Sequence, residues 1–278
     1  MQPSVKTVHF YRKRIRKKSP FSESTQPKKT KQLGDGRLVM GCFTDECGTI
    51  RPLTVSKGDK VHRYAAGSYG STPTLHPAKL KQRQILADRM REKATVLEVY
   101  AGKGELTNAV YSKKADKVVM VDKNPKFLSE ADQKLKGKVK REMILGDNTA
   151  WLKEAMNPTE LRNLKLVDFD AYGTPAEAVK TFFDHYPVNK TMFVALTDGS
   201  QLFVAYKQNA EGRRWLRENY GVDVLPGHFG KREDQIRILN EFIEAQGRKH
   251  GFKVEPVSVA HGVHAIYAGY KITPKRAG

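Results

Sequence analysis

The sequence has few cysteines, no long apolar run and, in its first part, almost no acidic side chains. Two cysteines among 278 residues, Cys42 and Cys47, cannot form a disulfide framework, which favours a reducing, cytoplasmic setting. Their spacing from His62 or His76 does not suit a four-ligand zinc site, so we expect no metal. No run of about 18 apolar residues occurs, so we expect no membrane-spanning helix. The basic N-terminus lacks the apolar stretch of a secretory signal.

Positive charge dominates the sequence, with 50 Lys and Arg against 30 Asp and Glu, a net +20. Residues 1–32 hold ten of the basic residues and one acid, Glu23, so they account for +9 of this charge. Because like charges repel and little apolar surface is present, we expect a disordered arm. The arm is interpreted either as a solvated tail or as a segment that binds nucleic-acid phosphates, through Arg12, Lys13, Arg14, Arg16, Lys17 and Lys18. No apolar stripe accompanies the charge, which argues against a membrane surface.

The rest of the chain changes pattern near residue 75. Residues 33–74 are predicted to form a small β-rich extension, with short strands at Leu38–Met40, Ile50–Val55 and Val61–Tyr64. A helix is expected over Pro77–Glu92, because proline suits the first turn and apolar residues recur at helical spacing. We expect residues 75–278 to form one α/β domain.

Strands and helices alternate regularly in that domain. The expected strands are Thr95–Tyr100, Lys117–Asp122, Arg141–Leu145, Lys165–Asp170 and Thr191–Thr197, and the expected helices between them are Glu105–Ser112, Pro125–Lys136, Thr149–Met156 and Pro175–Tyr186. This alternation predicts a doubly wound parallel sheet. After a helix at Gln235–His250, the runs Lys253–Val259 and His264–Thr273 are so close together that they must form an antiparallel hairpin. A seven-stranded, Rossmann-like sheet that ends in a hairpin resembles that of the class I methyltransferases, and the resemblance implies S-adenosylmethionine as cofactor.

The first strand of the domain ends in a Gly-x-Gly turn, Gly102 and Gly104, which opens the next helix. Glycines let a ligand approach the backbone at the carboxyl end of the strands. No third glycine follows at dinucleotide spacing, because Thr107 stands there. Glu98 within the strand resembles the acidic residue of the first methyltransferase motif and suits a cationic ligand. An ordinary tight turn is the alternative interpretation.

Acidic residues also end the next strands. Asp122 can accept both hydroxyls of a ribose, and Asp147 lies where the adenine meets this fold. Each is also suited to cap a helix, but their repetition at consecutive strand ends favours a site. The predicted cofactor-binding residues of this edge are Glu98, Tyr100, Gly102, Gly104, Asp122, Lys123, Asp147, Asn148 and Asp168.

The segment Asp168–Pro175 follows the fourth strand, where the methyl acceptor meets the donor. An exocyclic amine of a nucleobase is a weak nucleophile because its lone pair is conjugated with the ring. Asp170 can accept an N–H of such an amine, and Tyr172 offers a face on which the base stacks. We therefore predict that Asp170 and Tyr172 are catalytic. A capped turn with a half-buried aromatic side chain is the alternative.

This segment resembles the Asp-x-Asp-Pro-Phe-Gly-Ser-Pro signature of the tRNA guanine-N2 dimethyltransferases. Two further segments are similar to that family: Ala195–Asp198 after the fifth strand, and His76-Pro77 with Gln82-Arg83-Gln84 before the first. The likeness covers about Leu75 to Gly199 and implies that Arg83 holds the methionine carboxylate of the cofactor. Ala171 and Tyr172 replace the Pro and Phe of the signature.

The expected function is methyl transfer from S-adenosylmethionine to an exocyclic amine of a base in RNA, with guanine N2 of tRNA favoured. Two alternatives stay open. One is amino-methylation of DNA, and the other is a non-catalytic nucleic-acid-binding protein that keeps the fold. Trp215, among Arg213, Arg214 and Arg217, suits base stacking, although packing is the more ordinary role for such a residue.

Overall fold

The computed structural model describes the backbone of residues 31–32, 38–44 and 50–55, and it describes residues 75–90, 94–161, 163–200, 210–222, 232–262 and 265–275. The chain divides into two compact units, and the described residues before Thr74 belong to one and those from Leu75 onward to the other. The predicted strand Val61–Tyr64 lies outside the described residues. So do the predicted nucleic-acid-binding residues Arg12, Lys13, Arg14, Arg16, Lys17 and Lys18.

The N-terminal unit contains a three-stranded antiparallel sheet of β1 (Lys31–Gln32), β2 (Leu38–Thr44) and β3 (Ile50–Val55), in that order. The two strands predicted here correspond to β2 and β3. The structure differs at the expected end of the basic arm, because Lys31 and Gln32 pair with Val39 and Leu38. Those two residues therefore belong to the sheet.

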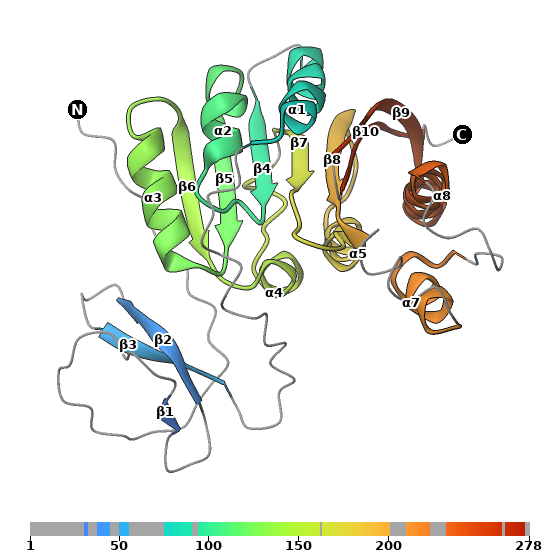
Figure 1. The fold of residues 1–278 in the computed structure, drawn as a ribbon. Helices are drawn as coiled ribbons and strands as arrows, with labels where there is room; N and C mark the ends of the chain where they lie inside the picture. The colour runs from blue at the N-terminus through green and yellow to red at the C-terminus, as the bar shows by residue number, and fades with distance from the viewer. Residues whose placement is uncertain are drawn as a thin grey trace. The chain divides into compact units, whose positions relative to one another are not determined.

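The second unit is built on a seven-stranded sheet in the order β6-β5-β4-β7-β8-β10-β9 (Figure 1). The parallel strands are β4 (Thr95–Val99), β5 (Lys117–Asp122), β6 (Lys140–Leu145), β7 (Leu164–Phe169) and β8 (Met192–Asp198). The hairpin strands β9 (Phe252–His261) and β10 (Ile266–Pro274) close one edge, where β10 pairs antiparallel with β8. The predicted sheet and its terminal hairpin are confirmed.

Helices cover both faces of this sheet (Figure 1). One face packs against α1 (Pro77–Arg89), α2 (Glu105–Ala109) and α3 (Pro125–Leu135). The other packs against α4 (Asn148–Glu154), α5 (Ala176–His185), α7 (Ala210–Tyr220) and α8 (Arg232–His250). Because both faces are covered, every residue of β4 and β8 is buried, which explains their nearly continuous apolar sequences.

The helix boundaries differ from the predictions mainly at their ends. The expected helix Glu105–Ser112 stops at Ala109 and gives way to a short 3₁₀ turn at Tyr111–Lys113. The helix α7 was not predicted; in it Trp215 packs against the core, with its ring 6.0 Å from that of Tyr220. Packing is therefore the role that the structure gives Trp215.

None of the described helices combines the length and the apolar character needed to span a membrane.

Candidate functional site

The predicted cofactor residues gather at the carboxyl ends of β4, β5 and β6. The turn after β4 is left-handed at three positions, with φ of 66° at Tyr100, 55° at Gly102 and 67° at Gly104. At Gly104 an added Cβ meets the Cβ of Ala131 at 2.9 Å, so only glycine lets α2 approach α3 this closely. At Gly102 an added Cβ meets nothing within 4 Å, so this part of the turn is open to a ligand.

Two side chains from the neighbouring strand ends hold this turn in place. Gly102 N donates to Asp122 Oδ2 at 2.8 Å, and Tyr100 N donates to Asn148 Oδ1 at 3.0 Å. Asn124 N donates to the other oxygen of Asp122, also at 2.8 Å. Each carboxylate oxygen keeps a further lone pair after these bonds. Asp122 can therefore order the turn and accept hydroxyls of a ligand at the same time.

The remaining predicted residues of this edge are more exposed. Asp147 caps α4 by accepting from Ala150 N at 3.0 Å, and it faces solvent. Lys123, directly after β5, is also exposed. The structure thus brings Tyr100, Gly102, Asp122 and Asn148 together through hydrogen bonds, with Asp147 at the rim.

Glu98 lies inside β4 and is only 1% exposed. Burial raises its pKa well above the ordinary range, and the nearby carboxylates of Asp168 and Asp170 raise it further. The hydroxyl of Thr107 donates to Glu98, which gives a structural reason for threonine where a dinucleotide site has its third glycine. A buried carboxyl of this kind ionises most readily when a cation is placed beside it.

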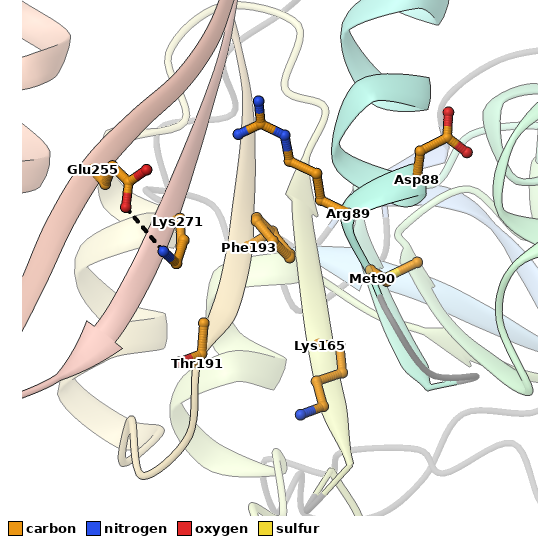
Figure 2. A pocket seen from close by; sticks show the side chains of 8 residues that line it. All are labelled: Asp88, Arg89, Met90, Lys165, Thr191, Phe193, Glu255 and Lys271. Atoms are coloured by element: carbon orange, nitrogen blue, oxygen red, sulfur yellow. Dashed lines mark hydrogen bonds and ion pairs between the residues drawn. The ribbon is translucent and has the colours of Figure 1, made fainter.

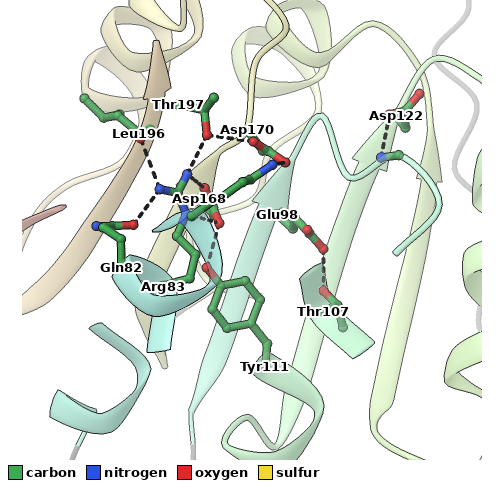
Figure 3. Close-up of polar contacts among 12 residues, drawn as sticks. Gln82, Arg83, Glu98, Thr107, Tyr111, Asp122, Asp168, Asp170, Leu196 and Thr197 are labelled. Atoms are coloured by element: carbon green, nitrogen blue, oxygen red, sulfur yellow. Dashed lines mark hydrogen bonds and ion pairs between the residues drawn. The ribbon is translucent and has the colours of Figure 1, made fainter. Parts of the chain in front are cut away.

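Arg83 of α1 is at the centre of a buried polar network (Figure 3). Its Nε and Nη2 donate to the two oxygens of Asp168 at 2.9 and 2.7 Å, which forms a bidentate ion pair. The other three N–H groups donate to Gln82 Oε1 at 2.6 Å, Leu196 O at 3.1 Å and Thr197 Oγ1 at 2.9 Å. Arg83 and Asp168 are both 0% exposed.

This placement corrects two predictions. All five N–H groups of Arg83 are used within the protein, so none is left for the cofactor carboxylate that the family resemblance assigns to it. Asp168, predicted to bind the cofactor, is instead the buried counter-ion of Arg83 and also accepts from Tyr111 Oη at 2.6 Å. Burial opposes the charged form of Arg83, but Asp168 outweighs it and raises the pKa above its usual value.

Asp170 follows β7 and lies where this network reaches solvent, with a side chain 17% exposed. Its backbone N–H donates to Val99 O at 3.1 Å, which places it beside the turn after β4. Its Oδ1 accepts from Thr197 Oγ1 at 2.7 Å, and its Oδ2 accepts from Lys79 Nζ at 2.5 Å. Burial alone raises the pKa of Asp170, but Lys79 and Arg83 outweigh it and lower the pKa below the ordinary value. Asp170 is therefore an anion at neutral pH.

Aromatic side chains flank Asp170. Tyr172 is 87% exposed on the loop after β7, so its ring is available for stacking. Tyr267 of β10 pairs in register with Thr197 and so projects from the same face of the sheet. The ring of His76 lies 5.8 Å from that of Tyr267.

Sequence reasoning missed Lys79 and Tyr267 as members of this site. Lys79 stands four residues before Arg83, and that spacing places both on one side of α1. The hairpin was the signal for Tyr267, because its inner strand β10 must lie beside β8, the strand that carries Thr197.

A separate cavity of about 610 Å³ lies at the opposite ends of the strands (Figure 2). Arg89 and Met90 end α1 there, and Lys165, Thr191 and Phe193 lie where β7 and β8 begin. None of the predicted site residues lines it. Ligands of doubly wound sheets bind at the carboxyl ends of the strands, so this cavity is not the candidate site.

Comparisons with known proteins support this assignment of the fold. The family model described as ribosomal RNA adenine dimethylase matches residues 74–167. The structure of Trm1 from Pyrococcus horikoshii with S-adenosyl-L-methionine superposes with a TM-score of 0.56 at 17% identity, over 71% of this chain and 55% of that one. The chain thus spans little more than half the length of Trm1. No curated protein matches the sequence.

Two further solved structures superpose less closely. An rRNA methylase from Streptococcus thermophilus has a TM-score of 0.42 at 14% identity, over 70% of this chain and 95% of that one. TYW2 from M. jannaschii in complex with AdoMet has a TM-score of 0.41 at 16% identity, over 72% of this chain and 77% of that one. The strand order, the matched family model and the Trm1 superposition together show that the unit that begins at Leu75 has the fold of the class I methyltransferases.

Proposed function

We propose that this protein transfers a methyl group from S-adenosylmethionine to an exocyclic amine of a nucleobase in RNA. The observation that carries the proposal is Asp170, an ionised and partly exposed carboxylate beside the turn after β4. A carboxylate in this place is suited to receive the N–H of an amine as the methyl group arrives.

The strand ends fit this cofactor. The open space at Gly102 leaves room for the cofactor to approach the protein backbone. The remaining lone pairs of Asp122 suit hydrogen bonds from the two ribose hydroxyls. Glu98 is a buried carboxyl that an ammonium group would ionise, and Asp147 at the rim suits the adenine amine. When bound, S-adenosylmethionine supplies an electrophilic methyl group on a sulfonium.

The residues on the acceptor side divide the remaining work. Transfer forms a bond between the amine nitrogen and the methyl carbon and breaks the sulfur–methyl bond, and one N–H proton leaves. Asp170 accepts a hydrogen bond from that N–H, which turns the lone pair of the amine nitrogen toward the methyl donor. Asp170 then takes the proton. The methylated nitrogen is a strong acid before it loses the proton, so a carboxylate of lowered pKa is basic enough. Tyr172 supports the base by stacking, and positioning supplies much of the rate.

We further propose that the acceptor is guanine N2 in tRNA. The support is the likeness of residues 168–175 to the tRNA guanine-N2 dimethyltransferase signature, together with the Trm1 superposition. Adenine N6 is the second candidate because of the description of the matched family model. That match ends at residue 167, before Asp170 and Tyr172. It therefore covers the strands that carry the predicted cofactor residues and not the loop after β7, which we call the acceptor loop.

Methyl transfer from tritiated S-adenosylmethionine to unmodified tRNA, rRNA and duplex DNA tests the proposal. Wild-type protein is expected to label tRNA above the other two. Asp170→Ala is expected to remove the label while cofactor affinity in calorimetry stays within about threefold. Label on DNA alone, or near wild-type transfer by Asp170→Ala, would contradict it.

A further inference from the structure

Lys79 contacts the carboxylate that the proposed reaction uses. Pro77 begins α1, and Lys79 lies in its first turn, from which Nζ reaches Asp170 Oδ2 at 2.5 Å. The two side chains are 15% and 17% exposed, whereas Arg83 and Asp168 are completely buried. Lys79 and Asp170 therefore form the ion pair of this network that solvent, or a substrate, can reach.

Both members of the pair keep hydrogen-bonding capacity. Asp170 accepts one bond at each oxygen, from Lys79 and from Thr197, and a carboxylate offers about four lone-pair sites. Lys79 has three N–H groups, and its contact with Asp170 uses one of them. An acceptor and a donor are thus presented side by side, about as far apart as two nitrogens bonded to one carbon.

This pattern complements an amidine, in which an amino group and an unprotonated ring nitrogen share a carbon. Guanine presents it through N2 and N3, and adenine through N6 and N1. The other edge of guanine places two donors, N1–H and N2–H, side by side, and the ammonium of Lys79 would oppose one of them. Asp170 alone cannot distinguish these edges, because it only accepts.

The surroundings suit a flat base. Tyr267 is 7% exposed on the same sheet face as Thr197, and the ring of His76 lies beside it. Tyr172 is exposed on the acceptor loop. Each of these aromatic residues is a neighbour of the network: Tyr172 follows Asp170 by two residues, Tyr267 pairs with Thr197, and His76 precedes Lys79 by three residues.

We infer that Lys79 is a substrate-binding residue that donates a hydrogen bond to the ring nitrogen next to the methylated amine. This inference rests on the proposed function. It limits the substrate to bases with an amidine edge, and it orients guanine so that N2 and N3 face the Lys79–Asp170 pair. Asp170 accepts from the amine while Lys79 fixes the angle at which the base enters.

A substrate analogue tests the inference. The RNA that wild-type protein methylates is resynthesised with the ring nitrogen replaced by C–H at the methylated base, which is 3-deazaguanosine for N2 or 1-deazaadenosine for N6. Wild-type kcat/KM is expected to fall about 10- to 100-fold on the analogue. Lys79→Met is expected to lose a similar factor on the natural RNA and to treat both RNAs alike. Lys79→Gln, which keeps a neutral donor, is expected to recover part of the discrimination.

Lys81→Met is the matched control, because Lys81 is an exposed lysine on the same helix, and it should behave like wild type. Unchanged cofactor affinity shows that each variant is folded. If Lys79→Met discriminates between the two RNAs as strongly as wild type, Lys79 does not read the ring nitrogen. If wild-type protein labels no RNA, the proposed function itself fails, and this inference fails with it.

Discussion

Arg83→Met separates the role that the family resemblance gives Arg83 from the role that the structure gives it. As a ligand of the cofactor, Arg83 would matter for binding and little for folding. As the buried partner of Asp168, it should matter for folding first. Without it, Asp168 keeps only the hydroxyl of Tyr111 and becomes a buried carboxylate with no counter-ion.

The structure allows the size of the effect to be worked out. Removing one partner of a buried ion pair costs about 3–5 kcal/mol of unfolding free energy. With a urea m-value of about 2–3 kcal/mol/M, the midpoint should fall by about 1–2 M. Lys at position 83 keeps the charge but not the bidentate geometry, so the loss should be smaller.

Urea unfolding followed by circular dichroism, with calorimetry of S-adenosylmethionine binding, measures both effects. Arg89→Met is the control, since Arg89 is exposed at the end of the same helix, and it should change stability by less than about 0.5 kcal/mol. Arg83→Lys provides the binding measurement if the Met variant does not fold. An unchanged urea midpoint together with a tenfold or larger loss of cofactor affinity would refute the structural role and restore the ligand role.

Three further predictions concern the turn after β4 and the basic arm. Asp122→Ala should lower cofactor affinity about tenfold or more in calorimetry, because ribose bonds worth about 1–3 kcal/mol are lost and Gly102 N loses its acceptor; unchanged affinity in a folded variant would remove Asp122 from the site. Gly104→Ala should cost about 1–3 kcal/mol in urea unfolding, and more than Gly137→Ala, since both have positive φ but only Gly104 is crowded. Deleting residues 1–30, which hold nine Lys and Arg, should lower the log–log salt slope of tRNA binding in fluorescence anisotropy by about three units, if four of these charges contact phosphate. Equal slopes would mean that the arm is passive.

The parallel strands of the large sheet could be predicted because most of them are short apolar runs, and the strands from β4 to β7 are each followed by a helix. Pro125 and the acid or amide caps before α3 and α4 mark helix starts in the sequence itself. The helix α7 was missed because five of its eleven residues are charged and Trp215 is its conspicuous apolar residue. Its packing against the core becomes visible only in three dimensions.

The placement of a candidate site residue could be predicted where it follows from a strand end, as at Gly102, Asp122 and Asp170. It was not predictable where the role depends on a distant partner. Arg83 and Lys79 are one helical turn apart. All N–H groups of Arg83 bind buried acceptors, whereas Lys79 is partly exposed and binds Asp170 at the carboxyl end of β7. A sequence shows both as basic residues of one helix, and only the packing of α1 against the sheet distinguishes them.

Mass spectrometry of nucleosides from the RNA that wild-type protein has methylated tests the central claim most directly. The account predicts methyl groups on an exocyclic amine, as N2-methylguanosine or N2,N2-dimethylguanosine, and none from Asp170→Ala. Methylated adenine N6 would keep the amine chemistry and replace guanine as the acceptor. Methyl groups on a ring nitrogen, a ring carbon or a ribose hydroxyl would contradict the account.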